Sequence, residues 1–174
     1  MNKSKLQYSD SRDHSLGIVG MAIALFAFDC SEYLISVSLK EGEQDFVISD
    51  DFVNFSLSFS DPSEAYQNQV DHFKVYCGMI FSNYFCRRYC AHRTPNIDDV
   101  KLIEKHLCTI AAAQMSIAED DASKIAHDVQ HSFRILYNQD MLVKIARDLA
   151  DELNTNVEMN HDEVNYYLSA FFEE

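Results

Sequence analysis

The run LGIVGMAIALFAF at residues 16–28 decides the fold, because it contains no charged or polar side chain over thirteen residues. At helical spacing these side chains cover nearly the whole circumference, and such a helix has to be enclosed by the rest of a domain. We therefore predict a buried core helix from Leu16 to about Ser31. One side of this helix carries only small residues: Gly17, Gly20, Ala24 and Ala27. We expect another backbone segment to approach that side closely.

The same run has to be compared with a secretory signal, because three cations precede it. Its flanks favour a core helix. Asp29 and Glu32 follow at once, and Asp29 stands before Cys30, where a lipoprotein signal has a small residue. Thirteen apolar residues are also too few to span a bilayer. We expect no membrane contact and a cytoplasmic protein, with export as the alternative.

After this helix the apolar period changes to that of a strand. Residues 33–39 alternate between one set that includes Ile35 and Val37 and a second set with two serines. A Gly-containing turn and the apolar residues 46–48 complete a hairpin. Residues 53–59 alternate again, with one polar face. We predict a small antiparallel β-meander over residues about 33–59.

A second long helix is predicted from Asp61 to about His92. Pro62 at the first helical position loses no hydrogen bond, and Asp61 can cap the helix start. Four further helices are expected, over residues 95–115, 119–137, 140–153 and 160 onward. In the last, Asn160 and Glu163 can form a variant of the capping box. The expected fold class is mainly α, a helical bundle of about six helices with the β-meander near one edge.

Length and composition favour a single domain. A chain of 174 residues can bury a sizeable core, and it contains no repeat and no Pro/Gly/Ser linker. We expect a loosely ordered polar segment at residues 1–14 and a single helical domain at 15–174. The five cysteines are odd in number and lie in apolar or helical runs, which indicates reduced, mostly buried thiols.

The charge is strongly negative and unevenly distributed. Fourteen Lys and Arg stand against 28 Asp and Glu, a net charge of -14, so binding of nucleic acid is not expected. No Lys or Arg occurs between Lys40 and Lys74 or after Arg147. These stretches would attract a basic partner protein at long range.

One candidate for chemistry is the pair His127 and His131, four apart on one predicted helix with Asp128 between them. Two imidazoles at this spacing can share a zinc ion. A zinc protease would need Glu where Asp128 stands, so that class of enzyme is not expected. The apolar stripe of this helix runs on the opposite side, which favours an ordinary solvated, charged face over a metal site.

The adjacent His127 and Asp128 are similar to the His-Asp pair of helical metal phosphohydrolases of the HD superfamily. That family uses an upstream histidine, the pair and a downstream aspartate from separate helices. The resemblance implies two further ligands, the first from His92 or His106 and the last from Asp140, Asp148 or Asp151. Val129 and Gln130 stand where the family usually continues with Gly-Lys, so the match covers only the pair.

A second possible metal cluster comprises Cys86, Cys90 and His92. Zinc knuckles place paired cysteines in a loop, whereas these lie in a strongly helical stretch, so buried thiols are the favoured interpretation. Arg87 and Arg88 could lower a thiol pKa.

The sequence contains no phosphate loop, dinucleotide fingerprint, nucleophile elbow or kinase signature. We therefore expect no catalytic residue and no cofactor. The leading hypothesis is a non-enzymatic protein–protein interaction module, an adaptor, inhibitor or immunity-type protein, that presents an acidic face to a basic partner. A metal-dependent hydrolase using His127, Asp128 and His131 is the alternative, and a purely structural subunit is a third possibility. A homodimer is also expected, through aromatic residues of the long helix: Tyr76, Phe81, Phe85 and Tyr89.

Overall fold

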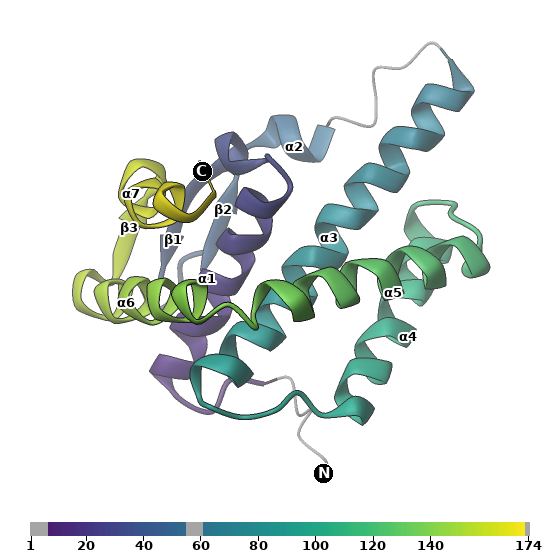
Figure 1. Ribbon diagram of the computed structural model, residues 1–174. Coiled ribbons are helices and arrows are strands. Elements are labelled where there is room, and N and C mark those ends of the chain that lie inside the picture. Colours follow the sequence, from purple (N-terminus) through teal and green to yellow (C-terminus); the bar gives the residue numbers. More distant parts are fainter. Residues whose placement is uncertain (1–6, 55–60, 173–174) are drawn as a thin grey trace.

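The computed structural model describes residues 7–54 and 61–172, which form a helical bundle with a small sheet at one side (Figure 1). The α-helices of the described residues are α1 (Ser11–Ala27), α2 (Asp50–Asn54), α3 (Pro62–Cys90), α4 (Ile97–Gln114), α5 (Glu119–Leu136), α6 (Asp140–Asn156) and α7 (His161–Phe172). A short 3-10 helix, η1 (Ser31–Tyr33), follows α1. The expected mainly α fold with a small antiparallel sheet is confirmed.

Helix α1 lies in the middle of the molecule and packs against α3, α6 and α7 (Figure 1). Most of its apolar residues are buried, as the sequence predicted, and Ile18, Ile23 and Leu25 have no exposed surface, whereas Ala27 at its end is exposed. The helix begins at Ser11, before the expected start, because the Asp10 side chain accepts a hydrogen bond from the Asp13 backbone N–H. Part of the segment expected to be loosely ordered is therefore helical, and residues 1–6 lie outside the described residues.

The close approach expected at the small side of α1 is present at Gly20. A Cβ atom there would lie 2.5 Å from the carbonyl oxygen of Ser82 and 2.8 Å from the Cα of Asn83, both in α3. These are backbone atoms, which cannot move aside as a side chain can. Glycine at this position therefore sets the distance between the two central helices.

The predicted hairpin is confirmed as β1 (Leu34–Ser38) and β2 (Phe46–Ile48), which pair antiparallel. The register shifts between Leu34 and Ser36, which marks a β-bulge or a similar irregularity. Because of this shift the regular alternation of the sequence breaks down. Leu34 and Val37 are buried, whereas Ile35 is 49% exposed.

The third strand of the sheet is not the one that the sequence predicted. β3 (Glu158–Asn160) pairs antiparallel with the other edge of β1, so the strand order is β2-β1-β3. Of the expected strand at 53–59, residues 53–54 belong to α2 and residues 55–60 lie outside the described residues. Asp50 and Asp51 occupy the first turn of α2, where carboxylates favour a helix start.

The helices after α2 begin and end close to the predicted positions. Asp61 accepts a hydrogen bond from the Ser63 backbone N–H, with Pro62 in the first turn of α3. At the start of α7 the capping box is complete. The Asn160 N–H donates to Glu163 Oε2 at 2.8 Å, and the Glu163 N–H donates to Asn160 Oδ1 at 3.1 Å.

Of the aromatic residues predicted for a dimer contact, the two phenylalanines are not available for one. Phe81 and Phe85 have no exposed surface, because α1 and α5 cover both faces of this part of α3. Tyr76 and Tyr89 are half-buried, and the Tyr89 ring stacks on Tyr137 with centroids 6.0 Å apart. The homodimer stays a prediction, without these two phenylalanines as its contact. Among the described residues, no helix combines the length and the apolar character needed to cross a membrane.

Candidate functional site

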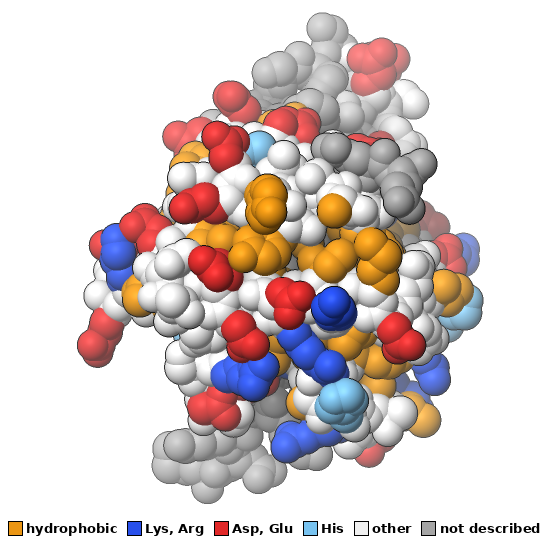
Figure 2. All heavy atoms as spheres, turned by 60° about the vertical axis from the view of Figure 1, so that its left-hand side comes forward, with side chains coloured by type: hydrophobic (Ala, Val, Ile, Leu, Met, Phe, Trp, Pro, Cys, Tyr) orange, Lys and Arg blue, Asp and Glu red, His pale blue; other side chains and the backbone are white. Residues whose placement is uncertain are grey.

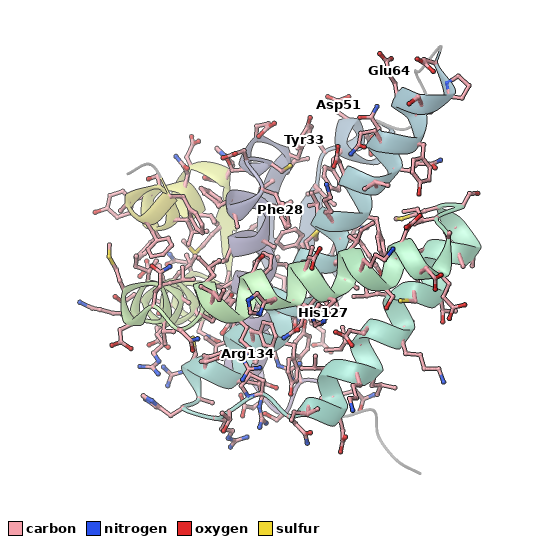
Figure 3. All side chains as sticks on the ribbon, turned by 45° about the vertical axis from the view of Figure 1, so that its right-hand side comes forward. Phe28, Tyr33, Asp51, Glu64, His127 and Arg134 are labelled. Carbon is pink, nitrogen blue, oxygen red and sulfur yellow. The ribbon has the colours of Figure 1, made fainter. Side chains whose placement is uncertain are left out.

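A cavity with mainly aromatic walls lies between the end of α1, η1, α2 and the first half of α3. Its volume is about 500 Å³. We call it the α2–α3 groove and define it by its lining residues: Phe28, Cys30, Tyr33, Phe52, Asn68, Asp71, His72, Lys74 and Val75. Figure 3 shows Phe28 and Tyr33 at the end of α1, on the side that faces α3.

The walls of the groove are mainly aromatic. The ring centroids of Tyr33 and Phe52 are 5.3 Å apart, and those of Phe52 and His72 are 4.6 Å apart. The Phe52 ring packs between the two others and is only 8% exposed, so its position in the groove wall is fixed by these contacts. Val75, on α3, is also buried. The groove can therefore take apolar side chains of a ligand.

The titratable groups of the groove are a neutral histidine in its wall and an ion pair at its rim. Burial lowers the pKa of His72, so its ring is uncharged at neutral pH. Asp71 lies at the rim, where it forms an ion pair of 2.8 Å with Lys74. The groove thus combines a neutral aromatic interior with charges at its edge.

Cys30 and His72 line the same groove, which raises the question of a thiol nucleophile with a histidine base. Burial, and then the charges of Glu32 and Asp29, raise the pKa of the Cys30 thiol. Its Sγ donates a hydrogen bond to the carbonyl oxygen of Phe28 at 3.3 Å. A reactive cysteine needs the opposite, a lowered pKa in an electropositive setting. The arrangement therefore does not support nucleophilic catalysis.

The elements that form the groove carry a surplus of acidic side chains. Asp29 and Glu32 stand at the junction of α1 and η1, and Asp50 and Asp51 open α2. All four are exposed. Of the described residues that line the groove, Lys74 is the only cation. Figure 3 shows Asp51 and Glu64 on the same upper side of the molecule as Phe28 and Tyr33. Exposed carboxylates thus stand next in sequence to residues that line the groove.

His127, Asp128 and His131 lie on the exposed side of α5, as the periodicity predicted. His127 is 3.9 Å from Glu104 of α4 and borders a shallow depression of about 340 Å³ (Figure 3). Within residues 7–54 and 61–172, no group of three or more His, Cys, Asp or Glu side chains is placed to hold a metal ion. The hydrolase hypothesis stays a prediction.

The further ligands implied by the resemblance to HD phosphohydrolases are dispersed. His92 Nε2 accepts a hydrogen bond from Arg147 Nη2 at 3.0 Å. His92 and Asp140 both line a cavity at the end of α3. Asp151 pairs with Arg12 of α1. None of these residues lines the depression beside His127. His106 and Asp148 are exposed positions on α4 and α6.

The opposite end of α3 carries a group of Lys and Arg side chains. A cavity of about 660 Å³ there is lined by Arg93, Lys144 and Arg147, and a second of about 400 Å³ by Arg12, Arg87, Arg88 and Arg93. On the face shown in Figure 2, most Lys and Arg side chains gather in the lower half, whereas acidic side chains predominate above the apolar band. Basic side chains therefore gather at this end of the molecule, beside acidic ones such as Asp13 and Asp140.

Comparison with known proteins gives no further information about the site. No family model matches the chain, and neither the curated proteins nor the solved structures contain a match.

Sequence reasoning did not identify the α2–α3 groove. Its residues come from four elements, and one of these, α2, was expected to be a strand. Two signals were present. The stretch without cations between Lys40 and Lys74 marks its charge, and Asn68 and His72 lie four apart, on one face of the predicted long helix.

Proposed function

We propose that this chain is a non-enzymatic protein–protein interaction module, of the adaptor, inhibitor or immunity type, and that it binds a basic amphipathic helix of a partner protein in the α2–α3 groove. One observation carries the proposal: an aromatic groove has exposed carboxylates next in sequence to its lining residues, and Lys74 is the single cation among the described ones.

The aromatic interior supplies the binding energy in this proposal. Burying one large apolar side chain contributes about 1.5–3 kcal/mol, and aromatic pockets at the centre of an interface hold the residues that contribute most. Tyr33 and Phe52 are preorganised by their ring contacts, with centroids 5.3 Å apart, so little side-chain freedom is lost on binding.

The carboxylates select the partner. Asp50 and Asp51 on α2, and Asp29 and Glu32 beside η1, favour a helix whose apolar stripe is flanked by Lys or Arg. They also raise the rate of association at low salt and disfavour acidic partners.

The test uses a synthetic amphipathic helix of about 18 residues with leucines at helical spacing and lysines on the other positions. Two control peptides are needed because the protein is acidic: a scrambled peptide of the same composition, and one with Glu in place of Lys. We expect saturable binding of the amphipathic lysine peptide only, followed by fluorescence anisotropy at physiological salt.

The location is tested by charge reversal. The double variant Asp50→Lys/Asp51→Lys should weaken binding by tenfold or more, about 1.4 kcal/mol. The matched control Asp120→Lys/Asp128→Lys makes the same change of charge on the exposed face of α5 and should leave binding nearly unchanged. Equal weakening by both variants, or equal binding of the scrambled peptide, would show a nonspecific charge effect and contradict the proposal.

A further inference from the structure

The last turns of α3 hold two thiols in direct contact. The Sγ atoms of Cys86 and Cys90 are 3.9 Å apart, and the two residues are 0% and 8% exposed. The sequence predicted buried thiols here but could not give this separation. No part of the α2–α3 groove is involved.

The surroundings of the pair favour negative charge on sulfur. The hydrogen bond from Cys86, together with the charges of Arg147 and Arg12, lowers the pKa of the Cys90 thiol against the effect of burial. Burial and the neighbouring sulfur raise the pKa of Cys86. The charges of Arg147 and Arg12 therefore favour the thiolate at Cys90, whereas burial favours the thiol at Cys86.

A disulfide does not fit this geometry. The S–S bond is about 2.05 Å long and joins Cβ atoms about 3.8 Å apart, whereas residues four apart on a helix hold their Cβ atoms about 5–6 Å apart. Closing the bond would require distortion of α3, which α1, α5 and α6 enclose at this point. The helix therefore keeps the two sulfurs as neighbours without letting them join.

A metal ion between the sulfurs does fit. Two metal–thiolate bonds of about 2.3 Å hold their sulfurs about 3.8–4.6 Å apart, from a tetrahedral to a linear angle at the metal. The observed 3.9 Å lies in this range. A small rotation of either side chain about its Cα–Cβ bond widens the separation toward the linear arrangement.

The number and type of ligands decide which metal. Zinc requires four ligands, and the described residues place no third His, Cys, Asp or Glu side chain at the pair. The nearest candidate by sequence, His92, has its Nε2 3.0 Å from Arg147 Nη2 and is held by that contact. Two soft thiolates without further donors suit a monovalent soft cation.

We propose that Cys86 and Cys90 form a two-coordinate thiolate site for Cu(I). Two thiolates and one Cu(I) carry a net charge of -1, which Arg147 and Arg12 offset. Binding releases the remaining thiol protons, so the affinity rises with pH.

The site has a route to solution. Val143 and Arg147 line the cavity of about 660 Å³ at the end of α3. Both contact Cys90. Arg147 Nε donates to the carbonyl oxygen of Cys90 at 3.0 Å, and Cys90 Sγ lies 3.7 Å from the carbonyl oxygen of Val143. The sulfur thus lies directly behind the wall of that cavity.

The test is an anaerobic titration of the reduced full chain with Cu(I) held as its bicinchoninate complex. We expect the protein to remove one equivalent of Cu(I) from the chelator, and X-ray absorption to show two sulfur neighbours. Cys86→Ala and Cys90→Ala should each lower the affinity by about 100-fold or more, because loss of a ligand exceeds the 10–100-fold cost of losing an outer partner.

The matched control is Cys77→Ala, another thiol of α3 without exposed surface, and it should leave the stoichiometry at one. Circular dichroism establishes that each variant is folded. Absence of Cu(I) uptake by the unaltered chain, uptake retained in the double variant Cys86→Ala/Cys90→Ala, or displacement of Cu(I) by an equal concentration of Zn(II) would each overturn the proposal. So would a Cys86–Cys90 disulfide formed readily in oxidised glutathione.

Discussion

The two ends of α3 belong to one continuous helix but differ in how far neighbouring elements cover them. At the N-terminal end its side chains are largely exposed, and beside them lies the α2–α3 groove. At the C-terminal end α1, α5 and α6 enclose the helix, and Phe81, Phe85 and Cys86 have no exposed surface. The sequence of α3 is mostly polar over residues 62–74 and mostly apolar over residues 75–86, so the helix's own pattern and its neighbouring elements together leave the N-terminal half exposed.

Charge follows the same division. The groove end lies within or beside the stretch that has no cation between Lys40 and Lys74, whereas Arg87, Arg88 and Arg93 gather at the other end. Cations near a helix C-terminus interact favourably with its dipole, and Arg88 also donates to the carbonyl oxygen of Thr94 at 2.8 Å. The arginines of the basic end therefore stabilise the C-terminus of α3. The carboxylates around the groove have no comparable set of cationic partners on the described lining.

The largest effect is expected at Gly20, where the backbone of α1 approaches that of α3. Replacing it with Ala places a Cβ atom 2.5 Å from the Ser82 carbonyl oxygen and forces α1 away from α3. We expect a loss of about 3 kcal/mol in the free energy of unfolding, the upper part of the range for overpacked cores. Urea unfolding followed by circular dichroism measures it.

Gly17→Ala is the comparison for that variant. Its added Cβ would meet side-chain atoms of Tyr8 and Asn83, which can move. A smaller loss than for Gly20→Ala is expected. Equal losses would mean that helix propensity or another local effect, rather than the close approach of two backbones, explains the glycine at position 20.

The sequence predicted the long helices well because local patterns mark them, whereas it missed the five-residue α2. Asp61 with Pro62 starts α3, and Asn160 with Glu163 starts α7, as the hydrogen bonds confirm. The third strand failed for the opposite reason. β3 has only three residues and pairs with β1, from which it is separated by more than a hundred residues in the sequence. No local sequence pattern could therefore predict it. The same holds for the groove, whose walls come from four elements, and for the 3.9 Å between the sulfurs.

At the basic end, the ion pair between Asp13 and Arg87 should make stability depend on pH. Burial would raise the pKa of Asp13, but the hydrogen bonds and charge of Arg87 outweigh it and lower the pKa. A carboxyl group with a lowered pKa stabilises the folded state above its unfolded pKa, about 3.9. This contribution is lost as the pH falls through the folded value. We expect Asp13→Asn to cost about 1–2 kcal/mol at pH 7 and little at pH 2.

The matched control for Asp13 is Asp151→Asn. Asp151 pairs with Arg12 at 3.1 Å, but its side chain is 58% exposed, against 19% for Asp13. Exposed ion pairs contribute little, so we expect a change below about 0.5 kcal/mol at every pH. Urea unfolding at pH 7, 4 and 2 measures both variants. If the cost of Asp13→Asn stayed constant with pH, the ion pair would not be its cause.

The smallest effect is expected on α5, whose outer face contrasts with both ends of α3. His127 and His131 are exposed, and His127 lies 3.9 Å from Glu104. Replacing both histidines with Ala should therefore change the free energy of unfolding by less than about 0.5 kcal/mol, as for other surface substitutions. The same protein, analysed for zinc, iron and manganese before and after the replacement, tests the hydrolase hypothesis independently of stability. Stoichiometric metal that disappears with the two histidines would transfer the functional site from the α2–α3 groove to α5. A metal content that the replacement leaves unchanged would leave the groove as the better-supported site.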